Sequence, residues 1–199
     1  MSHLCVVARS PAMRAFSFLA AMTVAVALVM GGRAMSRELD VPFVPTPQAV
    51  VDKMLEMADI KEGDYLIDLG SGDGRIPVTA AKKYGISALG VDLNPIRVQE
   101  ANENAKREKV TDKVEFREED LFQTDLSKAT VITMYLLNSV NMKLRPELLK
   151  LKPGTRIVSH SFGMGDWQPD QTETVEGRTV YMWIVPEKMP DLAPTENAL

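Results

Sequence analysis

The chain has 199 residues, 45% of them hydrophobic, so it is long enough to bury one substantial core. Arg9, Arg14 and Arg33 are the only charged residues before Met35; without them, 20 basic residues face 27 acidic ones. No basic run interleaved with aromatic residues occurs, which argues against a nucleic-acid substrate held by its backbone.

The amino end differs from the rest of the chain. Residues 15–32 contain no charged side chain, which is long for a signal-peptide core and near the lower limit for a membrane span. Gly32 and Ala34 are small residues that fit a cleavage after Ala34. We expect residues 1–34 to be a signal peptide or a membrane anchor, with the protein membrane-associated or exported. If Met35 is the true start, we expect a cytoplasmic protein.

Helix and strand patterns alternate from Val41 onward, as a parallel sheet requires. Thr46-Pro47 is typical of a helix start, with a capping hydroxyl and proline at the first helical position. An apolar stripe follows in the same segment, so we expect a helix there. Asn94-Pro95 opens a second helix in the same way, and we expect it to run to about Lys109.

A glycine-rich turn joins the first predicted strand to a helix. Tyr65 to Leu69 is a short apolar run that breaks at Gly70, Gly72 and Gly74. Without side chains, these residues let backbone N–H groups approach a ligand closely. The next predicted strand, 88–91, ends at an acid. The simpler alternative is a turn that merely connects a strand to a helix.

The glycine spacing separates the candidate cofactors. The dinucleotide fingerprint GxGxxG needs a third glycine where this chain has Arg75. No GK[ST] follows the turn, which excludes a phosphate loop. Asp92 lies at the carboxyl end of the second strand, where an acid can accept both hydroxyls of a bound ribose. The pattern therefore favours a nucleoside ligand that is not a dinucleotide.

The remaining elements complete the predicted sheet. Residues 131–136 are apolar throughout, which is typical of a central strand. We expect a flexible tail over residues 187–199. The other expected elements are strands at 114–117 and 156–159, a helix around 142–149, and a hairpin of 173–176 and 179–185 around Gly177.

Cysteine and histidine are scarce. Cys5 is the only cysteine, and His3 and His160 are the only histidines. The predicted domain therefore has no disulfide, no thiol nucleophile and no histidine-rich zinc site, and we predict no metal centre. Ser159 and Ser161 flank His160, but adjacent residues in a strand point to opposite faces, and no GxSxG elbow occurs. A hydrolase is disfavoured.

Several segments together resemble one enzyme family. The GxGxG turn, with Asp68 before it and Asp92 after it, resembles motif I and the following acidic strand end of class I S-adenosylmethionine methyltransferases. FVPTP (43–47), EDLF (119–122) and PGTRIVSHSF (153–162) add to the match. Together they resemble a bacterial branch of small methyltransferases related to the mitochondrial lysine methyltransferases that act on the ATP synthase c protein and on the adenine nucleotide translocator.

The resemblance covers about residues 41–185 and has implications for the fold and the cofactor. It implies an α/β, Rossmann-like class I methyltransferase domain over 35–186, with a mostly parallel seven-stranded sheet and helices on both faces. The implied cofactor is S-adenosyl-L-methionine. The predicted cofactor-binding residues are Thr46, Asp68, Gly70, Ser71, Gly72, Gly74, Asp92, Asp120 and Leu121.

Roles for these residues follow from their chemistry and from the family. Asp68 and the N–H groups of the turn are expected to hold the methionine part, and Asp92 the ribose hydroxyls. Asp120 is expected to accept from the adenine amino group, while the Leu121 N–H donates to a ring nitrogen. Asp120 has the alternative role of a helix or turn cap. Thr46 either closes over the ligand with its loop, as in the family, or only caps a helix.

Methyl transfer requires mainly that the nucleophile is aligned and water is excluded. Tyr135 and His160 are the candidate catalytic residues: the hydroxyl could orient an amine, and the imidazole could act as a base. A core aromatic and a structural histidine are the alternatives. Asn138, Asn141 and Trp167 are predicted to line the substrate channel, although Trp167 could simply plug the sheet edge. Asn138 stands where the family more often has proline.

We therefore predict methyl transfer from S-adenosylmethionine to a lysine of a protein substrate, with membrane proteins among the candidate substrates. The alternatives are a small-molecule or lipid-linked acceptor, and a non-catalytic module that binds the cofactor. We expect no nucleic-acid partner, and membrane contact through the N-terminal segment if it is not cleaved.

Overall fold

The computed structural model describes residues 43–192. The predicted signal peptide or anchor at residues 1–34 lies outside this range, as do residues 193–199 of the predicted tail. Between residues 43 and 192, no helix has both the length and the apolar composition needed to cross a bilayer.

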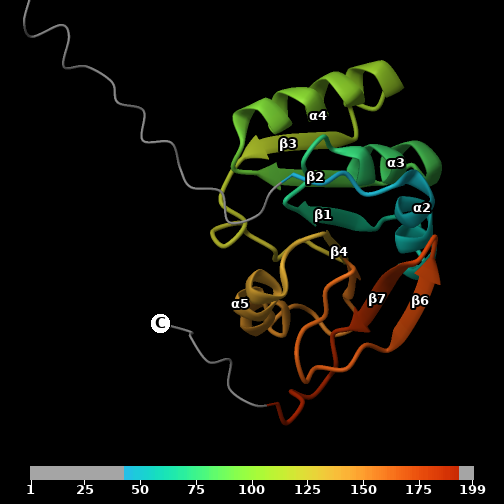
Figure 1. The fold of residues 1–199 in the computed structure, drawn as a ribbon. Coiled ribbons are helices and arrows are strands. Elements are labelled where there is room, and N and C mark those ends of the chain that lie inside the picture. The colour runs from blue at the N-terminus through green and yellow to red at the C-terminus, as the bar shows by residue number, and fades with distance from the viewer. Residues whose placement is uncertain (1–42, 193–199) are drawn as a thin grey trace, which may run out of the picture. The chain divides into compact units, whose positions relative to one another are not determined.

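The described chain forms a seven-stranded sheet in the order β3-β2-β1-β4-β5-β7-β6 (Figure 1). The first five strands pair in parallel, and β7 is antiparallel to both β5 and β6. The mostly parallel sheet and the central position of β4 are therefore confirmed. The strands are β1 (Tyr65–Leu69), β2 (Ser87–Asp92), β3 (Val114–Glu118), β4 (Val131–Met134), β5 (Arg156–His160), β6 (Gln171–Val175) and β7 (Arg178–Ile184).

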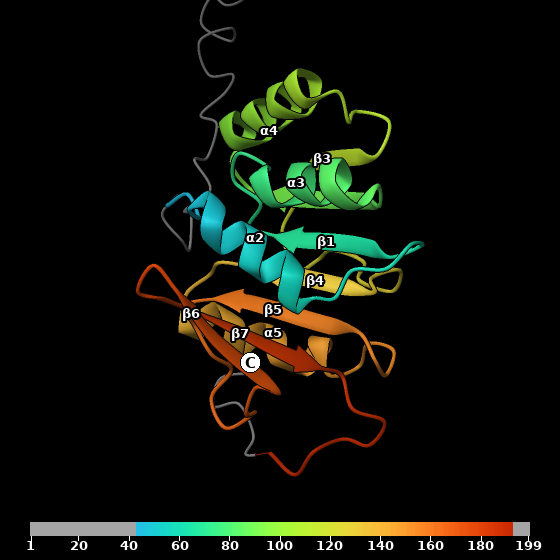
Figure 2. The same cartoon turned by 90° about the vertical axis from the view of Figure 1, so that its right-hand side faces the viewer.

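Helices cover both faces of this sheet (Figure 2). The helices α2 (Gln48–Met57), α3 (Arg75–Tyr84) and α4 (Pro95–Glu108) lie on one face, and α5 (Asn138–Leu148) lies on the other. Strand side chains alternate between the two resulting cores: Leu66 packs with α2 and α3, whereas Ile67 packs with α5. The layers match the predicted Rossmann-like arrangement.

Turn and cap chemistry explains several element ends. The Asn94 side chain accepts from the Ile96 N–H (3.0 Å) and caps α4, as its Asn-Pro start predicts. Glu176 and Gly177 join β6 to β7 with positive φ angles of 50° and 72°, which suit a tight hairpin. The predicted hairpin is confirmed.

Two sequence predictions need correction. Thr46 does not cap α2: the helix begins at Gln48 after Pro47, without a side-chain cap, and the Thr46 side chain is buried elsewhere. Strand β4 ends at Met134, two residues early, because the chain leaves the sheet to line a pocket. Residues 187–192 of the predicted tail have no helix or strand, and Leu192 packs against the core.

Candidate active site

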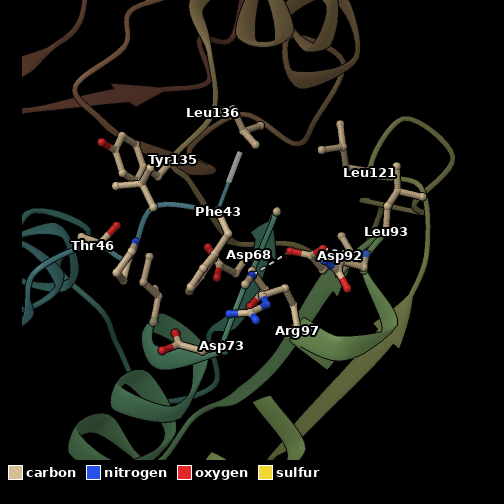
Figure 3. A pocket seen from close by; sticks show the side chains of 18 of the residues that line it. Phe43, Thr46, Asp68, Asp73, Asp92, Leu93, Arg97, Leu121, Tyr135 and Leu136 are labelled. Atoms are coloured by element: carbon tan, nitrogen blue, oxygen red, sulfur yellow. Dashed lines mark hydrogen bonds between the residues drawn. The ribbon is translucent and has the colours of Figure 1, made fainter. Parts of the chain in front are cut away.

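A pocket opens at the carboxyl ends of β1, β2 and β4, where the strand order reverses between β1 and β4 (Figure 3). Ligands of open α/β sheets bind at such a switch point. Apart from Gly74, all the predicted cofactor-binding residues line this pocket: Thr46, Asp68, Gly70, Ser71, Gly72, Asp92, Asp120 and Leu121.

Two glycines give the pocket its bare floor. Gly70 and Gly72 have φ angles of +73° and +54°, in the left-handed region that favours glycine. A Cβ on Gly70 would lie 2.7 Å from Cδ2 of Leu136, and one on Gly72 would lie 2.4 Å from Cε2 of Phe43. A side chain at either position would therefore collide with another residue that lines the pocket, so glycine is required to keep the turn in this shape.

Gly74 has a different role from the one predicted. It does not line the pocket, and a Cβ there would lie 2.5 Å from Cζ of Phe116 and 2.7 Å from Cβ of Ala101. Its φ of +74° also places it in the left-handed region just before α3. Gly74 therefore lets α3 begin close to its neighbours, which is a packing role.

Asp68 is a buried carboxylate at the floor of the pocket. It is 2% exposed, and its Oδ1 accepts a hydrogen bond from the Thr133 hydroxyl at 2.7 Å. Burial raises the pKa of Asp68 to about 6, although the bond from Thr133 acts in the opposite direction. A cationic ligand group would stabilise the ionised form here, so the site fits the ammonium end of S-adenosylmethionine.

Asp92 joins the glycine turn to the end of β2. Its Oδ2 accepts from the Gly72 N–H at 2.9 Å, and its Oδ1 accepts from the Asn94 N–H at 2.8 Å. A carboxylate has about four lone-pair sites, so it can accept from a ligand as well. Asp92 lines the pocket, and the ribose contact remains a prediction.

Asp120 and Leu121 follow β3 and line the pocket. Figure 3 shows Leu121 on the same side of the pocket as Asp92 and Leu93, away from Tyr135 and Thr46. The Asp120 carboxylate accepts from the Phe122 N–H at 3.0 Å, so the alternative role of a turn cap is realised. Because the capped turn also lines the pocket, capping and contact with an adenine are compatible.

Tyr135 and His160 pack together, but only Tyr135 lines the pocket. Their ring centroids are 3.8 Å apart, and His160 Nδ1 lies 3.2 Å from the Thr46 hydroxyl. His160 is fully buried, which lowers its pKa to about 4. It is therefore neutral at physiological pH and packs against Tyr135 and Thr46. The low pKa makes it a weak base, and its catalytic role stays a prediction.

The three predicted channel residues do not line the pocket. Asn138 is exposed at the first turn of α5. Asn141 is fully buried and donates to backbone carbonyls of the loop after β5. Trp167 is buried against Trp183, whose indole N–H donates to the Trp167 carbonyl at 2.8 Å. Trp167 packs in the core as its structural alternative describes, and its place in a substrate channel stays a prediction.

Two arginines that no sequence motif assigns to the site also line the pocket. Arg75 donates to the Thr46 carbonyl at 2.8 Å and is paired with Asp73. Arg97 lies over the Phe43 ring, 4.4 Å from its centroid, and this ring lies beside Gly72. The available sequence signal for this contact was Phe43 itself, an aromatic residue in FVPTP just before a helix start.

Metal ligands do not gather in the described part of the chain. Residues 43–192 contain no group of three or more histidine, cysteine, aspartate or glutamate side chains that could hold an ion. The polar groups at the pocket are instead placed to hold an organic ligand.

A solved structure shares both fold and sequence with this chain. It is described as an RNA methyltransferase from Salinibacter ruber in complex with S-adenosyl-L-homocysteine; it is 54% identical, with a TM-score of 0.73 over 77% of this chain and 100% of that one. An S-adenosylmethionine-dependent methyltransferase from Thiobacillus denitrificans, 23% identical with a TM-score of 0.52, shares the fold alone. Fold and pocket define an S-adenosylmethionine-dependent class I methyltransferase.

The family follows from sequence comparison. The ANTKMT methyltransferase domain matches residues 68–171. A protein-lysine N-methyltransferase of Saccharolobus islandicus is 45% identical over 153 residues, 74% of this chain and 95% of that protein. The adenine nucleotide translocase lysine N-methyltransferase of Mus musculus is 35% identical over 73% of this chain, which spans 63% of the mouse protein. The chain belongs to the ANTKMT methyltransferase family.

The predicted family and cofactor are therefore confirmed. The narrower assignment to a bacterial branch is not shown, because the relative at 45% identity is archaeal.

Proposed function

We propose that this enzyme methylates the side-chain amine of a lysine in a protein substrate. The supporting observation is the 45% identity to a protein-lysine N-methyltransferase across 95% of that protein. The pocket agrees with this proposal, because acidic residues line one part and the side chains of Tyr135 and Leu136 line another. An acceptor with an alkyl stem and an amine suits such a lining.

The residues described above divide the work of methyl transfer. Asp68, Asp92 and the glycine turn would hold S-adenosylmethionine, which supplies a methyl group activated by a positively charged sulfur. The acceptor ammonium would first lose a proton to water, because only the neutral amine has a free lone pair. That lone pair would form the nitrogen–carbon bond as the carbon–sulfur bond breaks, and S-adenosylhomocysteine would leave. Tyr135 and Leu136 exclude water from the approach, and removing water lowers the pKa of an amine.

An RNA acceptor is the second candidate, because the relative solved at 54% identity is described as an RNA methyltransferase. Five acidic residues line the pocket, Asp68, Asp73, Asp92, Glu119 and Asp120, and Arg75 is already paired with one of them. A predominantly acidic pocket lining opposes a phosphate backbone and favours a cationic side chain. Lysine is therefore the better-supported acceptor.

The enzyme is further proposed to act at a membrane or outside the cytoplasm. The uncharged stretch at residues 15–32 supports membrane association or export, and with it a membrane-protein acceptor. The placement in a bacterial branch rests likewise on the sequence segments alone.

A labelling experiment tests the acceptor. Purified full-length enzyme is incubated with a cell extract and S-adenosylmethionine that carries a tritiated methyl group, and the product is treated with protease or with ribonuclease. We expect protease-sensitive label that is recovered as methyl-lysine after acid hydrolysis. The Gly72→Val variant serves as the inactive control. Ribonuclease-sensitive label without methyl-lysine would refute the lysine assignment and support RNA.

A further inference from the structure

An aromatic surface leads out of the pocket at the end of β4. Tyr135 lines the pocket, and the ring of Phe162 lies beside it with 6.1 Å between centroids and 24° between planes. Phe162 is half-buried, whereas His160 behind the same tyrosine is fully buried. The rings therefore continue from the pocket to a partly exposed position, on the loop that follows β5.

The backbone of this loop is held in an unfavourable conformation. Ser161 has a φ of +65°, and the Phe162 N–H donates to the His160 carbonyl at 2.8 Å, which closes a turn around a single residue. Turns of this kind with positive φ are rare for residues other than glycine. Such strain persists only where the surrounding structure enforces it, and it is concentrated at functional sites.

Buried polar side chains enforce this turn. The Phe162 carbonyl accepts from the Ser159 hydroxyl at 2.6 Å and from the Asn141 amide at 3.1 Å. The same amide reaches the Gly163 carbonyl at 3.2 Å. Asn141 and Ser159 have no exposed surface. Burying polar groups is costly unless each is satisfied, and apolar packing would hold a loop without that cost.

The same helix holds the far part of the loop. Arg145 lies one turn after Asn141 on α5, and its guanidinium donates to the Met164 carbonyl at 3.2 Å and pairs with Asp166. Arg145 is itself 3% exposed. Two buried polar residues on one face of α5 therefore fix the course of the loop that carries Phe162.

We propose that Phe162 and Tyr135 form the wall that binds the acceptor side chain, and that Asn141 is a positioning residue that sets the Phe162 ring. This inference rests on the proposed lysine acceptor and specifies how the acceptor is recognised. Aromatic faces pack against the alkyl stem of a lysine and attract its ammonium group. They also replace water around the amine, which favours the neutral form that can accept a methyl group.

Two variants separate this role from cofactor binding. Phe162→Leu keeps an apolar side chain but removes the ring, and Asn141→Ala removes the anchor of the loop. Tyr84→Leu, an aromatic residue on α3 that does not line the pocket, is the matched control. The acceptor probe is a peptide pool with one central lysine and randomised flanks. S-adenosylhomocysteine affinity is measured by titration calorimetry, and folding by thermal unfolding.

We expect Phe162→Leu to raise the apparent KM for the peptide pool about fivefold while kcat changes less than about twofold. Asn141→Ala is expected to act in the same direction, and Tyr84→Leu to change neither constant. S-adenosylhomocysteine affinity should stay within about twofold in all three variants. A general structural defect would weaken both ligands together.

An unchanged KM in Phe162→Leu would overturn the inference, and so would an equal loss of S-adenosylhomocysteine affinity. These results differ from a failure of the proposed function, in which the wild-type enzyme itself methylates no lysine in the pool. Labelling of RNA by the wild-type enzyme, together with a loss of that labelling in Phe162→Leu, would reassign the wall to nucleobase stacking.

Discussion

Replacing Asp92 with alanine removes the link between the glycine turn and the end of β2. The carboxylate accepts from the Gly72 and Asn94 N–H groups at 2.9 and 2.8 Å. A hydrogen bond to a charged group contributes about 1.5–3 kcal/mol, and the partial exposure of Asp92 places both bonds near the lower limit. We expect the free energy of unfolding to fall by about 2–3 kcal/mol, and Tm by about 5–10 °C.

Cofactor affinity should fall further than this general loss explains. The Asp92→Ala variant loses the proposed ribose acceptor and a fixed position for the Gly72 N–H, so we expect about tenfold weaker binding or more. Titration calorimetry with S-adenosylhomocysteine measures the affinity, and thermal unfolding measures Tm.

A matched aspartate controls for the loss of charge alone. Asp112 is exposed in the turn before β3, and Asp112→Ala should change the stability by less than about 0.5 kcal/mol and leave binding intact. Unchanged affinity in Asp92→Ala would show that Asp92 is not the ribose acceptor. An unchanged Tm would show that its two backbone contacts contribute little.

Four further variants test the site. Because the pKa of Asp68 is about 6, the cationic cofactor should bind about tenfold more weakly near pH 5 than above pH 7. Titration calorimetry across this pH range should show no such change in Asp68→Asn. If the affinity of both proteins depends on pH in the same way, Asp68 is not the group that binds the ammonium. Burial lowers the pKa of His160 from 6.5 to about 4, so as the pH falls the unfolded state takes up a proton before the folded state does. The free energy of unfolding should therefore decrease as the pH drops from about 6.5 to about 4. Urea unfolding of His160→Gln should show a smaller decrease over this pH range, and an equal decrease would rule out His160 as its source. Gly72→Val should abolish cofactor binding and lower Tm only modestly, because the Phe43 ring that its side chain meets is 43% exposed and can move aside. Gly74→Ala should lower Tm more, because its Cβ meets the Phe116 ring and the buried Ala101. The reverse pattern would exchange their roles.

The local elements could be predicted because their signals lie within a few residues. The run at residues 65–69 has the same bounds as β1, and Asn94 caps α4 as its place before proline indicates. The positive φ angles of Gly70 and Gly72 follow from the same short motif. The strand ends then placed Asp68 and Asp92 at one pocket, because the carboxyl ends of parallel strands share an edge.

Contacts between distant segments could not be predicted from these signals. A hydroxyl before proline indicates a helix cap at Thr46, but this side chain contacts His160, which lies 114 positions later. The amide of Asn141 suits both a ligand contact in the channel and a buried anchor. Only the course of the loop after β5 distinguishes the two roles, and that loop is fixed by tertiary contacts.

The reversal of strand order between β1 and β4 separates the residues expected to bind the cofactor from those proposed to bind the acceptor. Contacts expected for S-adenosylmethionine lie on or directly after β1, β2 and β3, whereas the Tyr135 and Phe162 rings follow β4 and β5. A single ladder of backbone pairing joins these halves. Substitutions in the segments after β4 and β5 can therefore change the substrate specificity without weakening the binding of the methyl donor. Such a fold can acquire new substrates in evolution while it keeps its cofactor.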